Sequence, residues 1–194
     1  MEISTDVVKA LRDKTGVSIM QCKKALEEAD GDMQKAEVIL RKRSGAAADK
    51  KADRELGAGT IGSYVHNGEI GAMVLLSCET DFVARNAEFP ILAREIAMQI
   101  AATNPTYATE ADIAIEARTA AEAVFKKEVA DKPSDMREKI LEGKMKSYFS
   151  DQVLLEQPYI KDESKTIRDL LTEASQKFGE RVEITKFARF STRS

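Results

Sequence analysis

Apolar residues recur at helical spacing along residues 1–43 and predict three short helices. Ser4 or Thr5 can cap the first helix, which ends at the sequence KTG, and Ser18 and Asp32 can cap the other two. The apolar stripes are Val8 and Leu11, then Met20, Ala25, Leu26 and Ala29, and last Met33, Ala36, Ile39 and Leu40. A bundle this small has a thin core, so we expect its exposed face to serve in recognition or docking.

The apolar stripe stops after the third helix. Residues 44–57 therefore read as a linker that is helical in part. Residues 41–54 hold six basic residues against two acidic ones, a run that most simply forms solvated surface.

Beyond the linker the pattern predicts strands. Asn67-Gly68 favours a type I′ turn, because both residues tolerate positive φ, and this turn pairs His66 with Glu69. Positions 70, 72, 74, 76 and 78 then share one apolar face. Met73 and Leu75 on the other face predict a strand that is buried on both sides at its centre.

Helical patterns follow the hairpin. We expect helices over residues 89–103, with Pro90 in the first turn, over 109–130, from Ser134 to about 149, and over about 164–178, where Gly179 stops the last one. The final RVEITKFARF alternates imperfectly and predicts a strand that returns to the hairpin. Residues 58–194 thus form an α+β core, a small antiparallel three-stranded sheet packed with helices.

Composition narrows the class of protein. The 194 residues are 43% hydrophobic and 32% charged with a net charge of −3, which is typical of a globular protein with no global attraction to nucleic acid or membrane. The two cysteines are far apart and predict no disulfide framework. No signal region or long apolar run is visible, so we expect a cytoplasmic protein.

The sequence GAGTIG at residues 57–62, with Glu79 about 20 residues later, matches the spacing of a dinucleotide fingerprint. That motif requires a strand before the glycines and a helix after them. Here a charged linker precedes them and a hairpin follows, so we expect no direct nucleotide binding and no cofactor.

Catalytic chemistry has weak support. His66 is the single histidine, and neither Cys22 nor Cys78 has metal-ligand spacing to it. A Cys78–His66 nucleophile pair is conceivable, but a paired strand histidine near a turn is the simpler interpretation. We expect that the protein is not an enzyme and holds no metal.

The stretch CETDFVARN passes from the apolar strand to a helix through Asp81-Phe82. Thr80 or Asp81 can cap that helix, and an acid in the first turn complements its dipole. In one interpretation Phe82 is a core side chain beneath the helix. In the other it projects from a corner at the edge of the domain.

The motifs together resemble the elongation factor Ts family. The segments that carry the resemblance are LRDKTGVSIMQCKKALEEADGDMQKA, GSYVHNGEIG, CETDFVARN, EGKMKSYFSDQVLLEQPYIKD and KTIRDLL. The resemblance implies a guanine-nucleotide exchange factor that binds the GDP complex of translation elongation factor Tu, dislodges Mg²⁺ and promotes GDP release.

Residue roles follow from the same resemblance. Residues 1–43 match the family's ubiquitin-associated-like bundle. Residues 44–57 then correspond to the linker, and residues 58–194 to the α+β core, or dimerisation domain. Thr80, Asp81, Phe82 and Val83 match the segment that dislodges Mg²⁺. Arg12, Met20 and Lys23 match the face that docks on the partner, and His66 matches a contacting histidine.

The chain also departs from longer family members, which have two related core halves and a protruding helical hairpin. Because a single core offers half of that surface, we expect a homodimer that meets through the sheet face carrying Met73 and Leu75. Two other classes stay open at this stage. The bundle could belong to an adaptor for ubiquitin-like domains, and GAGTIG could mark an oxidoreductase.

Overall fold

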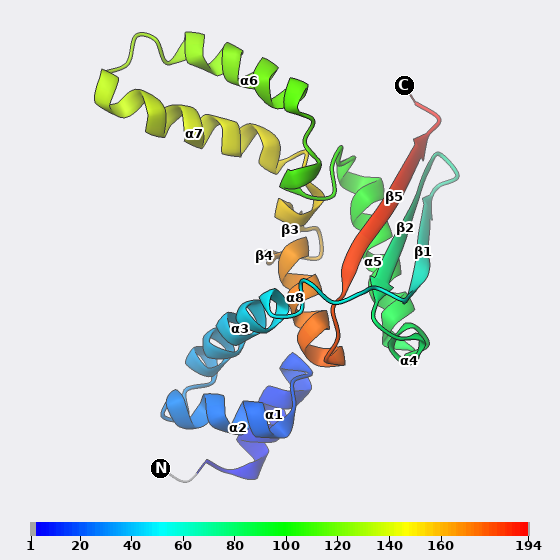
Figure 1. Ribbon diagram of the computed structural model, residues 1–194. Helices are drawn as coiled ribbons and strands as arrows, with labels where there is room; N and C mark the ends of the chain where they lie inside the picture. Colours follow the sequence, from blue (N-terminus) through cyan, green and yellow to red (C-terminus); the bar gives the residue numbers. More distant parts are fainter. Residues whose placement is uncertain (1–2, 194) are drawn as a thin grey trace. The chain divides into compact units, whose positions relative to one another are not determined.

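The computed structural model describes residues 3–193, and the described chain is of the α+β class, as predicted. In chain order the elements are α1 Thr5–Thr15, α2 Ile19–Glu28, α3 Met33–Asp49, β1 Ala58–His66, β2 Ile70–Cys78, α4 Asp81–Ala84, α5 Glu88–Thr103, α6 Ile115–Glu128, α7 Ser134–Ser150, β3 Pro158–Tyr159, β4 Asp162–Thr166, α8 Ile167–Phe178 and β5 Glu183–Ser191 (Figure 1). Strands β1, β2 and β5 form the predicted antiparallel sheet in the order β1-β2-β5, and β3 pairs with β4.

Contacts divide the chain into two compact units that both contain part of the sheet. Unit 1 comprises the residues up to Thr60, Leu76–Pro90 and Asp169–Thr185. Unit 2 comprises Ile61–Leu75, Ile91–Arg168 and the residues from Lys186 onward. The predicted division into a bundle, a linker and a core is a different partition, and it stays a prediction.

The three helices of the N-terminal bundle begin at the residues that the sequence indicated, and α1 and α2 also end there. The Ser4 side chain accepts a hydrogen bond at the start of α1, and Gly16 ends that helix with φ 68°. Ser18 caps α2, and the Asp32 carboxylate accepts the N–H of Lys35 at 3.0 Å at the start of α3. The buried core consists of Val8, Leu11, Val17, Cys22, Ala25, Leu26, Ala29, Ala36 and Leu40.

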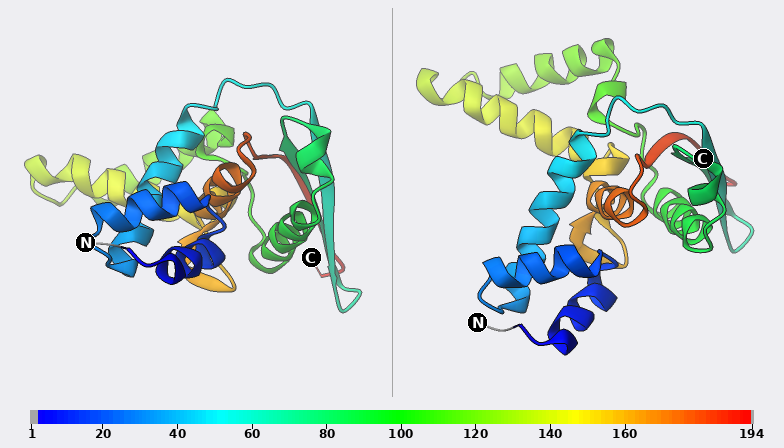
Figure 2. Two further views of the ribbon diagram at one scale, coloured as in Figure 1. Left: turned by 90° about the horizontal axis from the view of Figure 1, so that it is seen from below. Right: turned by 60° about the horizontal axis from the view of Figure 1, so that its bottom comes forward.

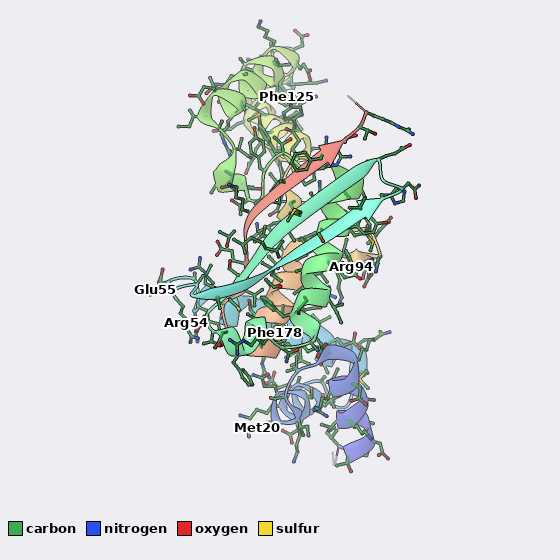
Figure 3. The ribbon with its side chains drawn as sticks, turned by 90° about the vertical axis from the view of Figure 1, so that its right-hand side faces the viewer. Met20, Arg54, Glu55, Arg94, Phe125 and Phe178 are labelled. Carbon is green, nitrogen blue, oxygen red and sulfur yellow. The ribbon has the colours of Figure 1, made fainter. Side chains whose placement is uncertain are left out.

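Met20 does not belong to this core, contrary to the sequence pattern. Its side chain is 69% exposed, and it reaches outward from α2 in Figure 3. The buried stripe of α2 runs through Cys22, Ala25 and Leu26. Met20 lies two residues before Cys22, about 200° around the helix, and so faces the opposite way.

Helix α3 continues past Arg43 through the start of the predicted linker and ends at Asp49. The sequence SGAAAD lacks an apolar stripe, but its three alanines have the highest helix propensity of any residue and favour continuation of the helix. After the helix, the ammonium group of Lys51 donates a hydrogen bond to the carbonyl of Ser175 at 2.9 Å. This contact ties the segment after α3 to α8 within unit 1.

The β1–β2 hairpin has the predicted turn. Asn67 and Gly68 have φ of 51° and 72°, and the N–H of Glu69 donates to the carbonyl of His66 at 2.9 Å. The predicted apolar face of β2 is buried at Ala72, Val74, Leu76 and Cys78. Met73 on the other face is 47% exposed, so the expectation of burial on both sides of β2 is wrong for this chain by itself.

Two glycines of GAGTIG lie inside β1 and make room for neighbouring backbone. A Cβ atom at Gly62 would come within 2.3 Å of the backbone of Ala93 in α5, which runs along the hairpin (Figure 2). One at Gly59 would come within 2.6 Å of the carbonyl oxygen of Leu76. The glycines are therefore packing positions within a strand, and they do not form the turn between a strand and a helix that a dinucleotide site requires.

Helices α6 and α7 lie antiparallel and form a helical hairpin in unit 2 (Figure 1). The two helices pack around the buried residues Ile113, Ala121, Phe149 and Val153. Phe125, labelled in Figure 3, meets Tyr148 edge to face with ring centroids 5.5 Å apart. The helical hairpin that the resemblance reserved for longer family members is therefore present here.

Candidate functional site

Helix α4 forms the corner that joins β2 to α5, and it presents Phe82 to solvent. The Phe82 side chain is 81% exposed, the largest exposed fraction among the exposed large apolar residues of the described chain, whereas Val83 beside it is only 3% exposed. Adjacent residues on a helix point about 100° apart, so burial of Val83 directs Phe82 outward. The interpretation of Phe82 as a core side chain is therefore wrong.

The strand end before α4 is held by Glu180, a residue that no sequence motif marks. One carboxylate oxygen of Glu180 accepts the N–H groups of Glu79 at 3.0 Å and Thr80 at 2.9 Å. The other accepts the Thr80 hydroxyl at 2.5 Å. Thr80 occupies the N-cap position of α4 but makes no side-chain cap bond there. Its hydroxyl is committed to Glu180 instead.

Glu79 makes a second set of contacts behind the corner. It accepts the backbone N–H of Arg181 at 2.6 Å and the guanidinium of Arg54 at 3.1 and 3.3 Å. Although burial alone would raise the pKa of the Glu79 carboxyl, these two donors outweigh that effect and hold the pKa below its ordinary value. Arg181 in turn donates to the carbonyl of Arg54 at 2.7 Å. Arg54, from the basic segment expected to be solvated surface, is thus bonded to the corner.

The start of α5 completes the support. The Asn86 side chain accepts the N–H of Glu88 at 3.0 Å, and Glu88 pairs with Lys177 at the end of α8. Phe89 is fully buried and meets Phe178 edge to face, with ring centroids 5.7 Å apart. The elements on either side of α4 therefore pack firmly, and the exposed ring of Phe82 stands on a supported corner.

The bundle presents a second exposed surface on α1 and α2. Met20 is 69% and Ile19 is 59% exposed. Lys23 lies 3.9 Å from Glu27, and both side chains are more than half exposed. Arg12 and Ile19 contribute to the lining of an open cavity of about 240 Å³ between the two helices. Arg12, Met20 and Lys23 are therefore all accessible on the N-terminal bundle.

The bundle also touches α8 within unit 1. The Gln176 amide donates to the side chain of Gln21 at 3.4 Å. A Cβ atom at Gly16 would lie 3.2 Å from the side chain of Lys177, so the end of α1 approaches α8 closely. The exposed face of α2 and the end of α8 are thereby linked through Gln21.

His66 lies in unit 2, at the end of β1. Its Nδ1 is 3.0 Å from the hydroxyl of Tyr64, and its Nε2 is 3.5 Å from the amide of Asn67. The guanidinium of Arg94, labelled in Figure 3, lies 5.6 Å from the centre of the Tyr64 ring. His66 is exposed and oriented by neighbours on its own hairpin.

The two cysteines are buried and free. The Cys78 thiol donates to the carbonyl of Thr80 at 3.2 Å, while His66 engages Tyr64, so the contacts do not support a Cys78–His66 nucleophile pair. Burial raises the pKa of the Cys78 thiol, and the nearby Glu180 carboxylate raises it further, which favours the protonated donor. Within residues 3–193, no group of three or more His, Cys, Asp or Glu side chains could hold a metal ion. No helix in that range is long and apolar enough to span a membrane.

The fold places the chain among α+β proteins that carry an N-terminal helical bundle. The model of the family described as "Elongation factor TS" matches residues 47–194. A relative named "Elongation factor Ts" from Thermodesulfovibrio yellowstonii is 49% identical over 191 residues, covering 98% of this chain and 96% of the relative. Relatives of the same name from Thermotoga petrophila and Oleidesulfovibrio alaskensis are 47% and 49% identical, each covered over 96% of its length. The chain belongs to the elongation factor Ts family.

Proposed function

We propose that this protein is a guanine-nucleotide exchange factor for translation elongation factor Tu. It binds the GDP complex of that factor, dislodges Mg²⁺ and promotes release of GDP so that GTP can bind. Membership of the family supports the choice of partner. The observation that carries the proposed mechanism is the exposure of Phe82 beside the buried Val83.

The mechanism uses Phe82 as a wedge. Elongation factor Tu holds GDP tightly because Mg²⁺ and backbone N–H groups neutralise the phosphates. Insertion of the Phe82 ring into the partner moves the groups that order the metal site, with Thr80, Asp81 and Val83 forming the rest of the inserted segment. Once Mg²⁺ leaves, the phosphate charge is poorly compensated, and the nucleotide dissociates.

Thermodynamics constrains this scheme. An exchange factor must bind the nucleotide-free partner more tightly than the GDP complex, because equal affinity for both states would shift nothing. The coupling is reciprocal, so GDP or GTP expels this protein to the same extent as this protein expels nucleotide. The activity breaks no covalent bond and needs no cofactor of its own.

The bundle supplies docking energy in this proposal. Arg12, Met20 and Lys23 contact the partner through the exposed face of α1 and α2, and His66 adds a contact from the hairpin. The support for this assignment is accessibility: Met20 is 69% exposed and the Lys23 side chain 61%. A methionine with adjacent basic groups fits a partner surface that is apolar at its centre and acidic at its rim.

The homodimer is part of the proposal. Ile61 and Val65 of β1 are 62% and 66% exposed, and Met73 of β2 is 47% exposed. A Cβ atom at Gly71 would lie 3.9 Å from Val65, which puts Val65 and Met73 on the same face of the hairpin. Gly62 contacts α5 on the opposite face. An apolar sheet face of this kind is what a second copy can cover.

The domain assignment belongs to the same hypothesis. Residues 1–43 form the ubiquitin-associated-like docking bundle, 44–57 the connection, and 58–194 the core that dimerises and carries the wedge. We place the protein in the cytoplasm, where its proposed partner works, and expect no nucleic-acid or membrane partner.

The test of the proposed function is stopped-flow release of a fluorescent GDP from elongation factor Tu. A large excess of unlabelled GDP prevents rebinding, and the concentration of this protein is varied. The proposal predicts a release rate that rises with concentration to a plateau. A release rate equal to that of elongation factor Tu alone at every concentration would refute it.

A further inference from the structure

Helix α4 is too short to set its own orientation. It spans four residues, Asp81–Ala84, and its N-cap residue Thr80 makes no side-chain cap bond. Forming a first helical turn is unfavourable unless other contacts stabilise it. The direction in which α4 presents Phe82 must therefore be fixed by groups outside the helix.

Val83 provides one such anchor, since it is 3% exposed. One buried side chain fixes a point, but the segment could still rotate about that point. The ion pair between Asp81 and Arg85 at 3.1 Å cannot supply the second anchor, because both side chains are at least 70% exposed and such pairs contribute little.

Glu180 supplies the second anchor at the other end of the segment. Its carboxylate accepts the N–H of Glu79, the N–H of Thr80 and the Thr80 hydroxyl, at 3.0, 2.9 and 2.5 Å. Hydrogen bonds to an ionised acceptor are about twice as strong as neutral ones. Three of them converge on the two residues that immediately precede Asp81.

Glu180 is itself held on a firm base. Gly179, with φ 75°, ends α8 and turns the chain so that Glu180 follows at once. Two residues later Val182 is 6% exposed, and its N–H donates to the hydroxyl of Ser175 at 3.1 Å. The carboxylate therefore projects from a short, packed turn between α8 and β5.

We propose that Glu180 is a positioning residue that fixes the orientation of Phe82. The inference rests on the proposed function of Phe82 as a wedge and adds a residue that does not touch the partner. Without the carboxylate, the N–H groups of Glu79 and Thr80 bond to water. The start of α4 then keeps the contacts of the Glu79 side chain and the bond from the Cys78 thiol to the Thr80 carbonyl, and these hold its direction less tightly. Fewer encounters then bring Phe82 into the geometry that displaces the metal.

The test compares two substitutions at Glu180. Glu180→Ala removes all three acceptor interactions. Glu180→Gln keeps the two bonds from the N–H groups through its amide oxygen and reverses the third, because its NH₂ donates to the Thr80 hydroxyl. These bonds are neutral and therefore weaker than those to the carboxylate. The matched control is Glu156→Ala. It deletes a different half-buried carboxylate, in unit 2, which accepts a hydrogen bond from Arg168 at 3.1 Å.

The kinetic arm measures release of fluorescent GDP from elongation factor Tu over a range of concentrations. Glu180→Ala is expected to lower the plateau rate about fivefold or more, the lower end of ordinary coupling effects, with a less than about twofold change in the half-saturating concentration. Glu156→Ala should behave as wild type, and the plateau rate of Glu180→Gln should lie closer to wild type than to Glu180→Ala. In a Phe82→Ala background, Glu180→Ala should cause no further loss, because the side chain that it orients is gone.

Three results would overturn the inference. One is a wild-type plateau rate for Glu180→Ala while Phe82→Ala is slow. Another is an equal loss from Glu180→Ala with and without Phe82. The third is a defect in Glu180→Gln as large as that of Glu180→Ala.

A second arm does not depend on the exchange activity. Hydrogen exchange of the Glu79 and Thr80 amides in the isolated protein should be slow in wild type and Glu180→Gln, and about tenfold or more faster in Glu180→Ala. If wild type fails to accelerate GDP release, the proposed function is wrong. This arm still tests whether Glu180 holds the backbone of Glu79 and Thr80. If both amides exchange as slowly in Glu180→Ala as in wild type, Glu180 does not hold this backbone. That conclusion would stand even if the nucleotide-exchange activity is confirmed.

Discussion

Replacement of Phe82 by alanine separates a wedge from a structural side chain. Phe82 is 81% exposed, so truncation removes little buried area from the folded protein. We expect the free energy of unfolding to change by less than about 0.5 kcal/mol, as for surface substitutions. A fully buried phenylalanine would instead cost about 3–5 kcal/mol.

The exchange activity should respond very differently. Burial of a phenylalanine ring in a partner pocket is worth about 1.5–3 kcal/mol. If that energy appears only when Mg²⁺ is displaced, its loss lowers the plateau rate of GDP release by about 10-fold to 150-fold. A part of the energy that is gained on first contact would instead raise the half-saturating concentration.

The assay measures stopped-flow GDP release and thermal unfolding on the same preparations. Ile115→Ala is the matched control, because Ile115 is 78% exposed and lies on α6, outside the proposed site. Val83→Ala is the opposite control, since Val83 is buried and its truncation should lower the melting temperature. Full activity of Phe82→Ala would refute the wedge. So would an activity loss that merely matches the loss of folded protein.

Three further predictions concern other parts of the molecule. Deletion of residues 1–50 should raise the half-saturating concentration for GDP release and leave the plateau rate unchanged. Lys23→Glu should raise the same concentration, with an effect that weakens as the salt concentration rises. Equal concentration curves for the truncated and full-length proteins would contradict docking by the bundle. Sedimentation of the wild-type protein at micromolar concentration should give twice the mass of one chain. Met73→Asp should give the mass of one chain, because it places a charge on the exposed sheet face. A wild-type protein that is monomeric and fully active would argue against the dimer. Gly62→Ala should lower the free energy of unfolding, measured with denaturant, by about 3 kcal/mol, because the added Cβ would lie 2.3 Å from the backbone of α5. Gly143→Ala, with open space around it in α7, should raise that free energy by about 0.5–1 kcal/mol. An unchanged free energy for Gly62→Ala would show that α5 does not pack so closely.

Local signals predicted most of the elements. The Asn67-Gly68 turn, the caps at Ser18 and Asp32 and the stop at Gly179 all act through nearby backbone, so their effects are legible in a short stretch of sequence. The same holds for the buried alternation of β2.

The features that sequence reasoning missed have separate physical causes. The exposure of Met20 follows from which helical face meets the other two helices, and its apolar character alone misassigned it. The sequence pattern placed the end of α3 too early, because the alanine-rich end of this helix shows no apolar stripe. The short β3–β4 pair involves segments of two and five residues, too brief to show a period.

The candidate site was predictable in part. The corner at Asp81-Phe82 is visible as an abrupt change from strand to helix, but its sequence allowed both a buried and an exposed phenylalanine. Glu180 lies 101 positions from Glu79, and no local pattern marks it as a partner. The pairing of β5 beside β2 and the contact of Phe178 with Phe89 bring the turn after α8 to this corner.

The dependence of GDP release on free Mg²⁺ tests the central claim most directly. If Phe82 acts by displacing Mg²⁺, metal and wedge favour opposite states of one site. The acceleration by wild-type protein should then fall steadily as Mg²⁺ rises, and the deficit of Phe82→Ala relative to wild type should shrink when Mg²⁺ is removed by a chelator. An acceleration that stays constant across the Mg²⁺ range, with the same Phe82→Ala deficit in chelator, would contradict the account.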